Sequence, residues 1–320
     1  MIVVTGGAGF IGSNLVKALC ARGEREVLVV DNLEDGRKFN NIVDAGILDY
    51  LDMKVFLERL ESGQQSLRKI SSVFHLGACS DTTEWDGRYM MQNNYEYSKQ
   101  LLHYCTEAQI AFIYASSAAV YGAGQEFCER AECERPINVY GYSKALFDHY
   151  ARRYINNNRT QIAGLRYFNV YGPGESHKGR MASMAFHLHH QLTAGKPMKL
   201  FEGCDGYADG EQLRDFIYVQ DAVAVNLWFY EHPECSGVFN VGTGSSQSFN
   251  DVAQTVAAWH GHGDMDYVPF PDDLKGRYQS FTEADLTLLR QTGCDVVFRN
   301  VEQGVRNYLD RLEAKDGSHR

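Results

Sequence analysis

The sequence predicts an α/β protein with a doubly wound parallel sheet and a smaller, discontinuous substrate-binding lobe. Short β-branched runs alternate with amphipathic segments through the first half of the chain, which is the pattern of parallel strands joined by crossover helices. A glycine-rich turn follows the first run at once. After Gly174 the sequence becomes loop-rich, so we expect the second lobe to be assembled from separated segments.

Five β-branched runs are predicted as the strands of the sheet, and the segments between them as helices covering both of its faces. Two later runs are predicted as returning strands. The strands are expected at Ile2–Thr5, Val27–Asp31, Ser72–Leu76, Phe112–Ser116 and Ile162–Tyr167, the helices at Phe10–Arg22, Tyr89–Glu107 and Tyr142–Ile155, and the returning strands at Asp215–Asp221 and Gly237–Gly242.

Two domains are expected. The larger, nucleotide-binding domain covers residues 1–170 and takes back a segment near 215–245. The smaller, substrate-binding domain combines residues 171–214 with 246–320. No internal repeat or long linker interrupts this arrangement.

Composition narrows the classes of function. The chain of 320 residues carries 31 basic and 41 acidic side chains, a net charge of −10, which argues against nucleic-acid or anionic-membrane partners. The first strand begins without a basic leader, and no apolar run is long enough to span a bilayer, so we expect a soluble cytoplasmic protein. The eight cysteines include no C-x-x-C pair, and we expect reduced, structural thiols and no metal site.

A dinucleotide site is predicted at the start of the chain. Gly6, Gly9 and Gly12 form G-x-x-G-x-x-G between a predicted strand and a predicted helix, the setting of a Rossmann-type fingerprint. Glycines let the backbone approach a pyrophosphate, and the helix N-terminus supplies amide donors. The small residues 76–80 follow another strand and are expected to contact the same cofactor.

The nature of the dinucleotide stays open at this point. Asp31 ends the second strand about 20 residues after the glycine turn, where an acidic side chain grips a ribose 2′-hydroxyl and favours NAD. Asn32, Arg37 and Lys38 follow and are suited to a 2′-phosphate, which favours NADP.

Acid–base chemistry is predicted for Tyr140 and Lys144. Four residues apart, they share one face of a helix, and a nearby ammonium favours the phenolate. Ser117 ends a predicted strand and can hydrogen-bond a substrate oxygen beside Tyr140. Together with a dinucleotide, these residues indicate redox chemistry on an alcohol.

These motifs resemble the extended short-chain dehydrogenase/reductase family, which also carries an R-Y-F-N strand end like Arg166–Asn169. From residue 1 to about 312 the chain also resembles a narrower group within that family, the ADP-L-glycero-D-manno-heptose 6-epimerases. The segments that carry this closer resemblance are Met1–Asn14, Thr83–Gly87, Asn138–Lys144, Phe168–Pro173, His177–Gly179 and Leu274–Tyr278.

The resemblance implies epimerisation of ADP-heptose at C6, for lipopolysaccharide core precursors, with one NADP per subunit in a homo-oligomer such as the family's pentamer. It implies that Tyr140 and Lys178 transfer protons, that Ser117 positions the sugar and that Lys144 orients the nicotinamide ribose. The implied cofactor contacts are Gly6, Gly9, Phe10, Ile11, Gly12, Asp31, Asn32, Lys38, Leu76, Gly77, Ala78, Cys79, Ser80, Asn93, Tyr140, Lys144, Val170 and Lys178; the implied substrate contacts are Ser117, Asn169, Arg180, His187, Phe201, Glu202, Gly203, Cys204, Arg214 and Tyr278.

The proposed chemistry explains a need for two proton-transfer groups. C6 lies outside the sugar ring, so rotation about C5–C6 turns either face of a ketone toward a fixed nicotinamide. That rotation moves the ketone oxygen beyond the reach of one donor, about 3 Å. Which of Tyr140 and Lys178 serves which orientation stays open. Arg214 and Arg277 are candidates for binding the substrate's diphosphate.

Four other functions compete with this interpretation. A sugar-nucleotide 4,6-dehydratase is disfavoured because Ala118-Ala119 stands where that group carries an acid pair. A UDP-sugar 4-epimerase or a sugar-nucleotide dehydrogenase shares the fold and remains the enzymatic alternative. A nucleotide-sensing module without catalysis is disfavoured because the Tyr and Lys residues are all retained. The chain departs from the closer family at Met53, where a lysine can stand, and at Arg180.

Overall fold

The structure is a computed structural model, and it describes residues 1–62, 69–155, 159–271 and 279–317. A seven-stranded sheet in the order β11-β6-β5-β4-β1-β2-β3 forms its centre, and every strand pair in it is parallel. Its strands are β1 (Ile2–Thr5), β2 (Val27–Asp31), β3 (Asp49–Asp52), β4 (Ser72–His75), β5 (Ala111–Ser117), β6 (Ile162–Tyr167) and β11 (Gly237–Val241).

The strand order reverses beside β1. The chain runs from β1 outward to β2 and β3, then crosses to β4 on the other side of β1. The carboxyl ends of β1 and β4 therefore face a crevice where the helices that follow diverge, which is the usual ligand position in such sheets.

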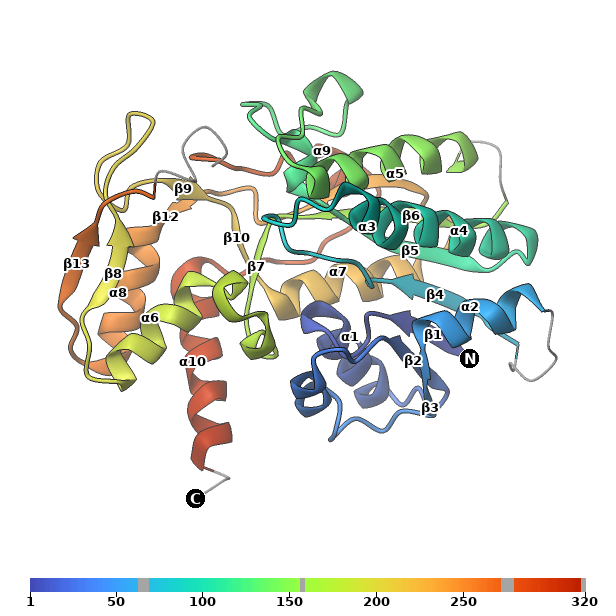
Figure 1. The fold of residues 1–320 in the computed structure, drawn as a ribbon, viewed down its shortest axis with the longest axis horizontal. Helices are drawn as coiled ribbons and strands as arrows, with labels where there is room; N and C mark the ends of the chain where they lie inside the picture. The colour runs from blue at the N-terminus through green and yellow to red at the C-terminus, as the bar shows by residue number, and fades with distance from the viewer. Residues whose placement is uncertain (63–68, 156–158, 272–278, 318–320) are drawn as a thin grey trace.

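Helices cover both faces of the sheet (Figure 1). Helices α1 (Phe10–Ala21) and α7 (Val219–Glu231) pack on one face, where their apolar side chains share a core with β1, β2 and β6. Helices α2 (Met53–Glu61), α4 (Tyr97–Glu107) and α5 (Val139–Ile155) pack on the other. The doubly wound α/β arrangement predicted from the sequence is confirmed.

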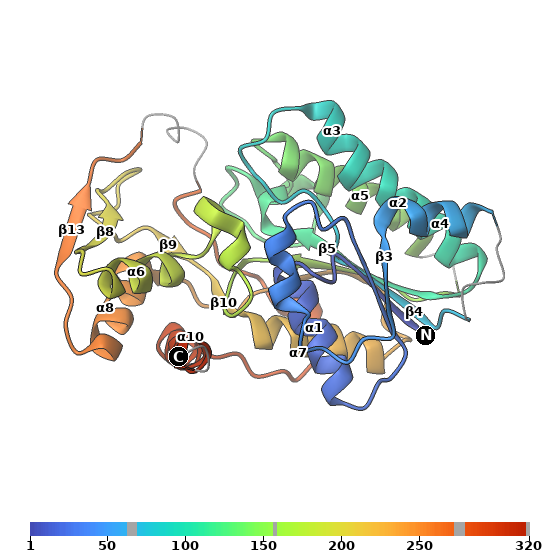
Figure 2. The ribbon, with the colours of Figure 1, turned by 60° about the horizontal axis from the view of Figure 1, so that its bottom comes forward.

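The second lobe stands beside the carboxyl edge of the sheet (Figure 2). Helices α6 (Met184–Thr193), α8 (Phe249–His260) and α10 (Val301–Gly317) enclose its core with the parallel pair β8 (Met198–Phe201) and β13 (Met265–Val268). Phe10 of α1 belongs to the same core, so the two parts of the molecule meet at the glycine turn. The exact division into two domains stays a prediction.

Short elements connect these layers. They are the 3₁₀ turns η1 (Gly36–Asn41), η3 (Ala118–Tyr121), η4 (Ala131–Cys133) and η5 (Ser176–Met181), the π turn η2 (Gln92–Glu96), the helices α3 (Gly87–Met91) and α9 (Thr287–Gln291), and the paired strands β7 (Asn169–Tyr171) with β10 (Phe216–Tyr218) and β9 (Leu213–Arg214) with β12 (Gln247–Ser248).

The structure differs from the sequence-based elements at several places. Helix α2 was not predicted, and α5 begins at Val139 rather than at Tyr142. Strand β3 was not predicted, because Leu51 is its one buried residue and edge strands leave little apolar periodicity. The run predicted as a strand over Asp215–Asp221 ends at Tyr218, where α7 begins, and Asp221 lies in the first turn of that helix, a favourable place for an acid. The helix predicted over Tyr89–Glu107 contains a π turn, which is frequent at functional sites.

All eight cysteines are thiols. Within the described ranges, no helix has the length and apolar character that a bilayer crossing requires.

Candidate active site

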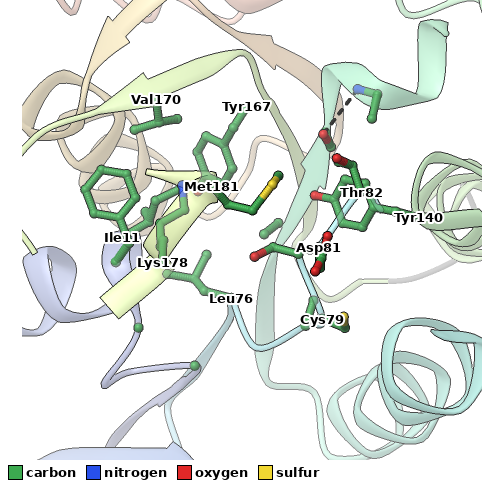
Figure 3. A pocket seen from close by; sticks show the side chains of 18 of the residues that line it. Ile11, Leu76, Cys79, Asp81, Thr82, Tyr140, Tyr167, Val170, Lys178 and Met181 are labelled. Atoms are coloured by element: carbon green, nitrogen blue, oxygen red, sulfur yellow. Dashed lines mark hydrogen bonds between the residues drawn. The ribbon is translucent and has the colours of Figure 1, made fainter. Parts of the chain in front are cut away.

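A cavity of about 990 Å³ opens at the carboxyl edge of the sheet, between the sheet and the second lobe. Every cofactor contact implied by the family resemblance lines it, whereas Arg37, the further candidate for a 2′-phosphate, does not. Figure 3 shows Tyr140 and Lys178 entering from opposite sides. The cavity thus joins the glycine turn near residue 6 to a helix about 130 residues later.

The floor of the cavity is a turn that requires glycine. Gly6 has φ +64, and a Cβ there would lie 2.6 Å from the backbone nitrogen of Gly77. A Cβ on Gly12 would lie 2.1 Å from the carbonyl oxygen of Gly6. Helix α1 follows without a side-chain cap at Gly9, so amide donors of its first turn are available to an anion. This cradle fits a dinucleotide pyrophosphate.

Asp31 and Lys38 form an ion pair. The Lys38 ammonium lies 2.5 Å from one Asp31 carboxylate oxygen and 2.9 Å from the Asn32 amide oxygen. The other Asp31 oxygen accepts a hydrogen bond from the Ala8 amide at 3.1 Å. The sequence suggested opposite preferences for these two side chains, and the structure makes them partners, so the negative charge of Asp31 is locally balanced. Arg37 instead pairs with Asp35 on the surface.

Tyr140 lies in the first turn of α5 against the end of β5. A Cβ on Gly141 would lie 2.5 Å from the carbonyl oxygen of Ala119, so only glycine allows α5 to approach η3 this closely. That approach brings the Ser117 hydroxyl to Tyr140, where its hydrogen bond acts to lower the phenol's pKa. Burial is the larger effect and raises the pKa of Tyr140.

The expectation that a nearby ammonium and the cofactor's charged ring favour the Tyr140 phenolate stays a prediction. The dominant influence is removal of the phenol from water, which disfavours its charged form. Lys144 donates to the carbonyl oxygen of Ala115 at 2.8 Å. Burial lowers its own pKa to about 8, against an opposing influence of Asp148.

Lys178 reaches the cavity from η5. Its ammonium lies 5.1 Å from the centre of the Phe10 ring, within the range of a cation–π contact. Burial lowers the pKa of Lys178, while the nearby carboxylate of Glu175 raises it. A desolvated amine with a lowered pKa is suited to exchange protons near neutral pH.

Glu175 fixes the segment that carries Lys178. Its buried carboxylate accepts from the amide and the hydroxyl of Ser183, both at 2.6 Å, and from the Gly172 amide at 3.3 Å. Its carbonyl oxygen accepts from the Lys178 amide at 2.9 Å. The loop between β7 and α6 is thus tied to a single side chain.

Only some of the residues predicted for the substrate line the cavity. Ser117, Asn169, Arg180, Phe201 and Arg214 line the cavity. Arg180 hydrogen-bonds the Thr83 hydroxyl, and Arg214 lies 5.7 Å from the ring centre of Phe249. Arg214 is thus held inside the cavity, where a guanidinium suits phosphate oxygens.

The other predicted substrate residues do not meet there. In the described part of the chain, His187 and Glu202–Cys204 lie outside the cavity lining. The backbone at Gly203 turns away, with its amide donating to Asp209 at 2.8 Å. Tyr278, with the neighbouring candidate Arg277, lies outside the described residues.

Sequence reasoning missed residues that brace the cavity from behind. Asn94 accepts from the Cys79 amide at 2.8 Å and donates to the Cys79 carbonyl at 2.9 Å, so it holds the 76–80 turn. His75 contacts Thr5 at 2.7 Å and Ser98 at 2.8 Å, and burial lowers its pKa to about 3. The position of His75 directly before the predicted 76–80 turn was the signal available from the sequence, and Asn94 carries none.

Arg166, noted in the sequence as part of R-Y-F-N, has a structural role. It is fully buried, donates to Asp148 of α5 at 2.9 Å and to the Tyr121 hydroxyl at 3.0 Å, and pairs with Glu134. Strand β6, helix α5 and the segment after η3 are therefore joined beneath Tyr140.

Comparisons with known proteins agree with this geometry. The family model "NAD dependent epimerase/dehydratase family" matches residues 2–242. An ADP-L-glycero-D-manno-heptose-6-epimerase of Alkalilimnicola ehrlichii is 58% identical over 312 residues, which cover 98% of this chain and 97% of that protein.

Solved structures give the same picture. The ADP-L-glycero-D-manno-heptose-6-epimerase of Helicobacter pylori superposes with a TM-score of 0.83 at 32% identity, covering 98% of this chain and 96% of that one. The UDP-glucose 4-epimerase of Thermus thermophilus in complex with NAD superposes with a TM-score of 0.78 at 28% identity, covering 97% of each chain.

Proposed function

This chain belongs to the NAD dependent epimerase/dehydratase family, and from that premise we propose that it converts ADP-D-glycero-D-manno-heptose into ADP-L-glycero-D-manno-heptose. The reaction inverts C6 by transient oxidation and reduction and supplies lipopolysaccharide core precursors. The observation that carries the proposal is that Tyr140 and Lys178 line one cavity from opposite sides, above a dinucleotide cradle.

The cofactor in this proposal is one NADP per subunit. Bound in the cavity, it would supply reversible hydride transfer at C6, with removal from one face of that carbon and return to the other. Gly6, Gly9 and Gly12 would cradle its pyrophosphate, and Lys144 would hold the nicotinamide ribose. The Lys38 ammonium balances Asp31, which supports NADP because a 2′-phosphate beside an unbalanced carboxylate would be repelled.

Tyr140 and Lys178 would each serve one orientation of the C6 oxygen. Tyr140 shares a hydrogen bond with Ser117, which would keep the phenol directed at the sugar. Lys178 has a pKa lowered by burial, so a neutral amine is accessible to receive a proton and an ammonium to return it. Rotation about C5–C6 would carry the oxygen from one group to the other.

The substrate would bind between the sheet and the second lobe. Arg214 and Arg180 support recognition of the diphosphate, since guanidinium groups match phosphate oxygens, and both line the cavity. Ser117 and Asn169 would contact the sugar. The family resemblance supports a homo-oligomeric assembly, and a cytoplasmic location completes the proposal.

Two measurements test this function. Purified protein should convert ADP-D-glycero-D-manno-heptose into its C6 epimer, seen as a new anomeric signal by NMR, without net formation of NADPH absorbance. Mass spectrometry of the small molecules released by unfolding should find NADP. Turnover of UDP-galactose but not of the ADP-heptose would favour a UDP-sugar 4-epimerase, and net NADPH would favour a dehydrogenase. Release of NAD instead of NADP would overturn the proposed cofactor but not the proposed epimerisation.

A further inference from the structure

Two cysteines outside the cavity lie unusually close together. The Sγ atoms of Cys128 and Cys133 are 2.8 Å apart. This distance is shorter than an ordinary non-bonded contact of about 3.5–4.0 Å and longer than an S–S bond of about 2.05 Å. Neither cysteine lines the cavity, so the pair is a separate feature of the protein.

The backbone on both sides of Cys128 is anchored. The carbonyl oxygen of Phe127 accepts from the Asn240 side chain at 2.7 Å and from the Asp285 amide at 3.2 Å. The carbonyl oxygen of Glu129 accepts from Arg152 at 3.0 Å. Cys128 therefore cannot move far from its neighbour.

Cys133 is held as firmly. It ends the 3₁₀ turn η4, its amide donates to the Arg130 carbonyl at 3.1 Å, and the next residue, Glu134, pairs with the buried Arg166. Two anchored backbones thus keep both thiols within a short displacement of bonding distance.

A metal site is a poorer fit for this cluster. Glu126 completes a group of three possible ligands, but the Arg130 guanidinium lies 3.1 Å from the Glu126 carboxylate and 3.9 Å from the Cys133 sulfur, where it opposes a cation. Tetrahedral zinc with Zn–S of about 2.3 Å separates two sulfur ligands by about 3.8 Å, farther than the sulfurs lie here.

We infer that Cys128 and Cys133 are a redox-active pair, which forms a reversible intrachain disulfide by exchange with a low-molecular-weight disulfide. The disulfide would link the two ends of the Cys128–Cys133 loop. The chain just before that loop reaches the cavity wall, because the carbonyl oxygen of Gly122, six residues before Cys128, accepts a hydrogen bond from the cavity-lining Gln279 at 2.7 Å.

Exposure assigns the order of events. Cys128 is partly exposed, whereas Cys133 is 6% exposed. The Cys128 thiolate attacks the small disulfide, its S–S bond breaks, and one thiolate leaves with the bonding electron pair. The Cys133 thiolate then attacks the Cys128 sulfur and displaces the second thiolate. Two protein thiols are oxidised, one small disulfide is reduced, and the two protons pass to the departing thiolates.

The surroundings favour the second step once the first has occurred. Burial, and then the contact with Cys128, raises the pKa of Cys133 to about 11, while Arg130 acts to lower it. In the mixed disulfide Cys128 no longer carries an ionisable thiol, so its raising influence on the Cys133 pKa is lost, while the influences of burial and of Arg130 remain.

The test uses the full-length reduced protein, incubated with oxidised glutathione, quenched in acid and alkylated under denaturing conditions. Intact mass should show two fewer alkylated thiols and no retained glutathione. Trypsin cuts after Arg130, between the two cysteines, so a linked pair of peptides that separates on reduction identifies the disulfide. Fragmentation distinguishes Cys128 from Cys105 on the same peptide.

Variants test the order of attack. Cys133→Ser should retain glutathione on Cys128, because no second thiol resolves the mixed disulfide. Cys128→Ser should remain unmodified at Cys133. Cys20→Ser, which removes another partly exposed thiol, should form the Cys128–Cys133 link as the unaltered protein does.

Three outcomes overturn the inference: separate glutathione adducts on Cys128 and Cys133, a link to any other cysteine, or unreacted Cys128 and Cys133 while Cys20 is modified. Zinc released from the purified protein by a chelator, with both thiols becoming reactive afterwards, would also overturn it in favour of a metal site. The peptide map of the unaltered protein decides the question even where a variant fails to fold.

Discussion

At the scale of single residues, burial sets the chemistry of the cavity. It raises the pKa of Tyr140, lowers that of Lys144 to about 8 and lowers that of Lys178. In each case removal from water disfavours the charged form. The cavity therefore holds a phenol and two amines whose neutral forms are stabilised, a suitable set for transferring protons to and from an alcohol.

Lys178→Met should abolish epimerisation while leaving the bound dinucleotide in place. The change removes the amine and keeps the aliphatic stem against Phe10, so we expect a loss of turnover of about 100-fold or more. Turnover of the ADP-heptose and the amount of released dinucleotide are the two readouts. Lys199→Met, at an exposed lysine of β8, is the control. Undiminished turnover in the Lys178 variant would remove this residue from the mechanism.

His75 predicts a pH dependence of stability. Its pKa is lowered from 6.5 to about 3 by burial, so below about pH 6.5 the unfolded chain binds a proton that the folded chain does not. Above pH 6.5 His75 does not reduce the free energy of unfolding. As the pH falls from 6.5 toward 3, protonation of His75 in the unfolded chain lowers that free energy. We expect this loss to be absent in His75→Gln, so the free energy of unfolding of the variant should fall less steeply with pH, by up to about 1.4 kcal/mol per pH unit. Urea unfolding of both proteins between about pH 7 and 5 measures it, and parallel pH curves would contradict the prediction.

At the scale of elements, close backbone approach positions the site. Glycines at the β1–α1 turn and at the start of α5 let backbone lie where a side chain would stand. The segment carrying Lys178 depends instead on a buried carboxylate, Glu175, that gathers three hydrogen bonds. Two different structural features thus place the glycine turn and Lys178 at the cavity.

Gly12→Ala should disrupt the cradle. The new Cβ would meet the Gly6 carbonyl oxygen at 2.1 Å, so we expect a loss of about 1–3 kcal/mol in the free energy of unfolding and at least about tenfold weaker dinucleotide binding. Gly46→Ala is the control, because nothing lies within 4 Å of its Cβ position. Titration calorimetry and thermal melting compare the two, and equal behaviour would refute the steric argument.

Glu175→Gln should act through Lys178. The carboxylate raises the pKa of Lys178, so its loss should move the ionisation of Lys178 to lower pH and reduce kcat by about tenfold, with a smaller change in KM. The pH profile of kcat separates this effect from a general loss of structure. Glu107→Gln, at an exposed residue of α4, provides the comparison. A variant with lower kcat but an unshifted profile would assign Glu175 a purely structural role.

At the scale of the whole molecule, Arg166 joins parts of the chain that are distant in sequence. It connects β6 to Asp148 of α5 and to Glu134, while Phe10 links the sheet domain to the core of the second lobe. The cavity lies where these two connections converge, so its shape depends on the packing of the entire chain.

Arg166→Met should destabilise the protein by about 3–5 kcal/mol, because Asp148 and Glu134 would remain as buried charges with a partner removed. Chemical unfolding measures the change. Arg306→Met, in an exposed i,i+4 pair with Glu302 on α10, should cost less than about 1 kcal/mol. Equal losses in the two variants would show that the buried ion pairs of Arg166 stabilise the protein no more than an exposed ion pair does.

Much of the fold was predictable because its signals are local. The strands β1, β2 and β6 were located to the residue, since buried parallel strands read as continuous apolar runs. Strand β3 and the start of α7 were not, because an exposed edge strand and a strand that passes directly into a helix carry weak periodicity. In the site, the glycine turn and Tyr140 came from spacing, whereas Asn94 and Glu175 belong to no motif. Asn94 owes its role to Cys79, 15 residues earlier, and Glu175 to the folded path of the loop that brings Ser183 to its carboxylate.

By itself, the sequence determined the cradle at Gly6–Gly12 and the shared helical face of Tyr140 and Lys144, because both follow from backbone geometry over a few residues. The tertiary structure decided the pairing of Asp31 with Lys38, the position of Lys178 across the cavity from Tyr140 and the approach of Cys128 to Cys133. These depend on how the folded chain packs around each side chain and on how much water that packing excludes, which local spacing does not encode.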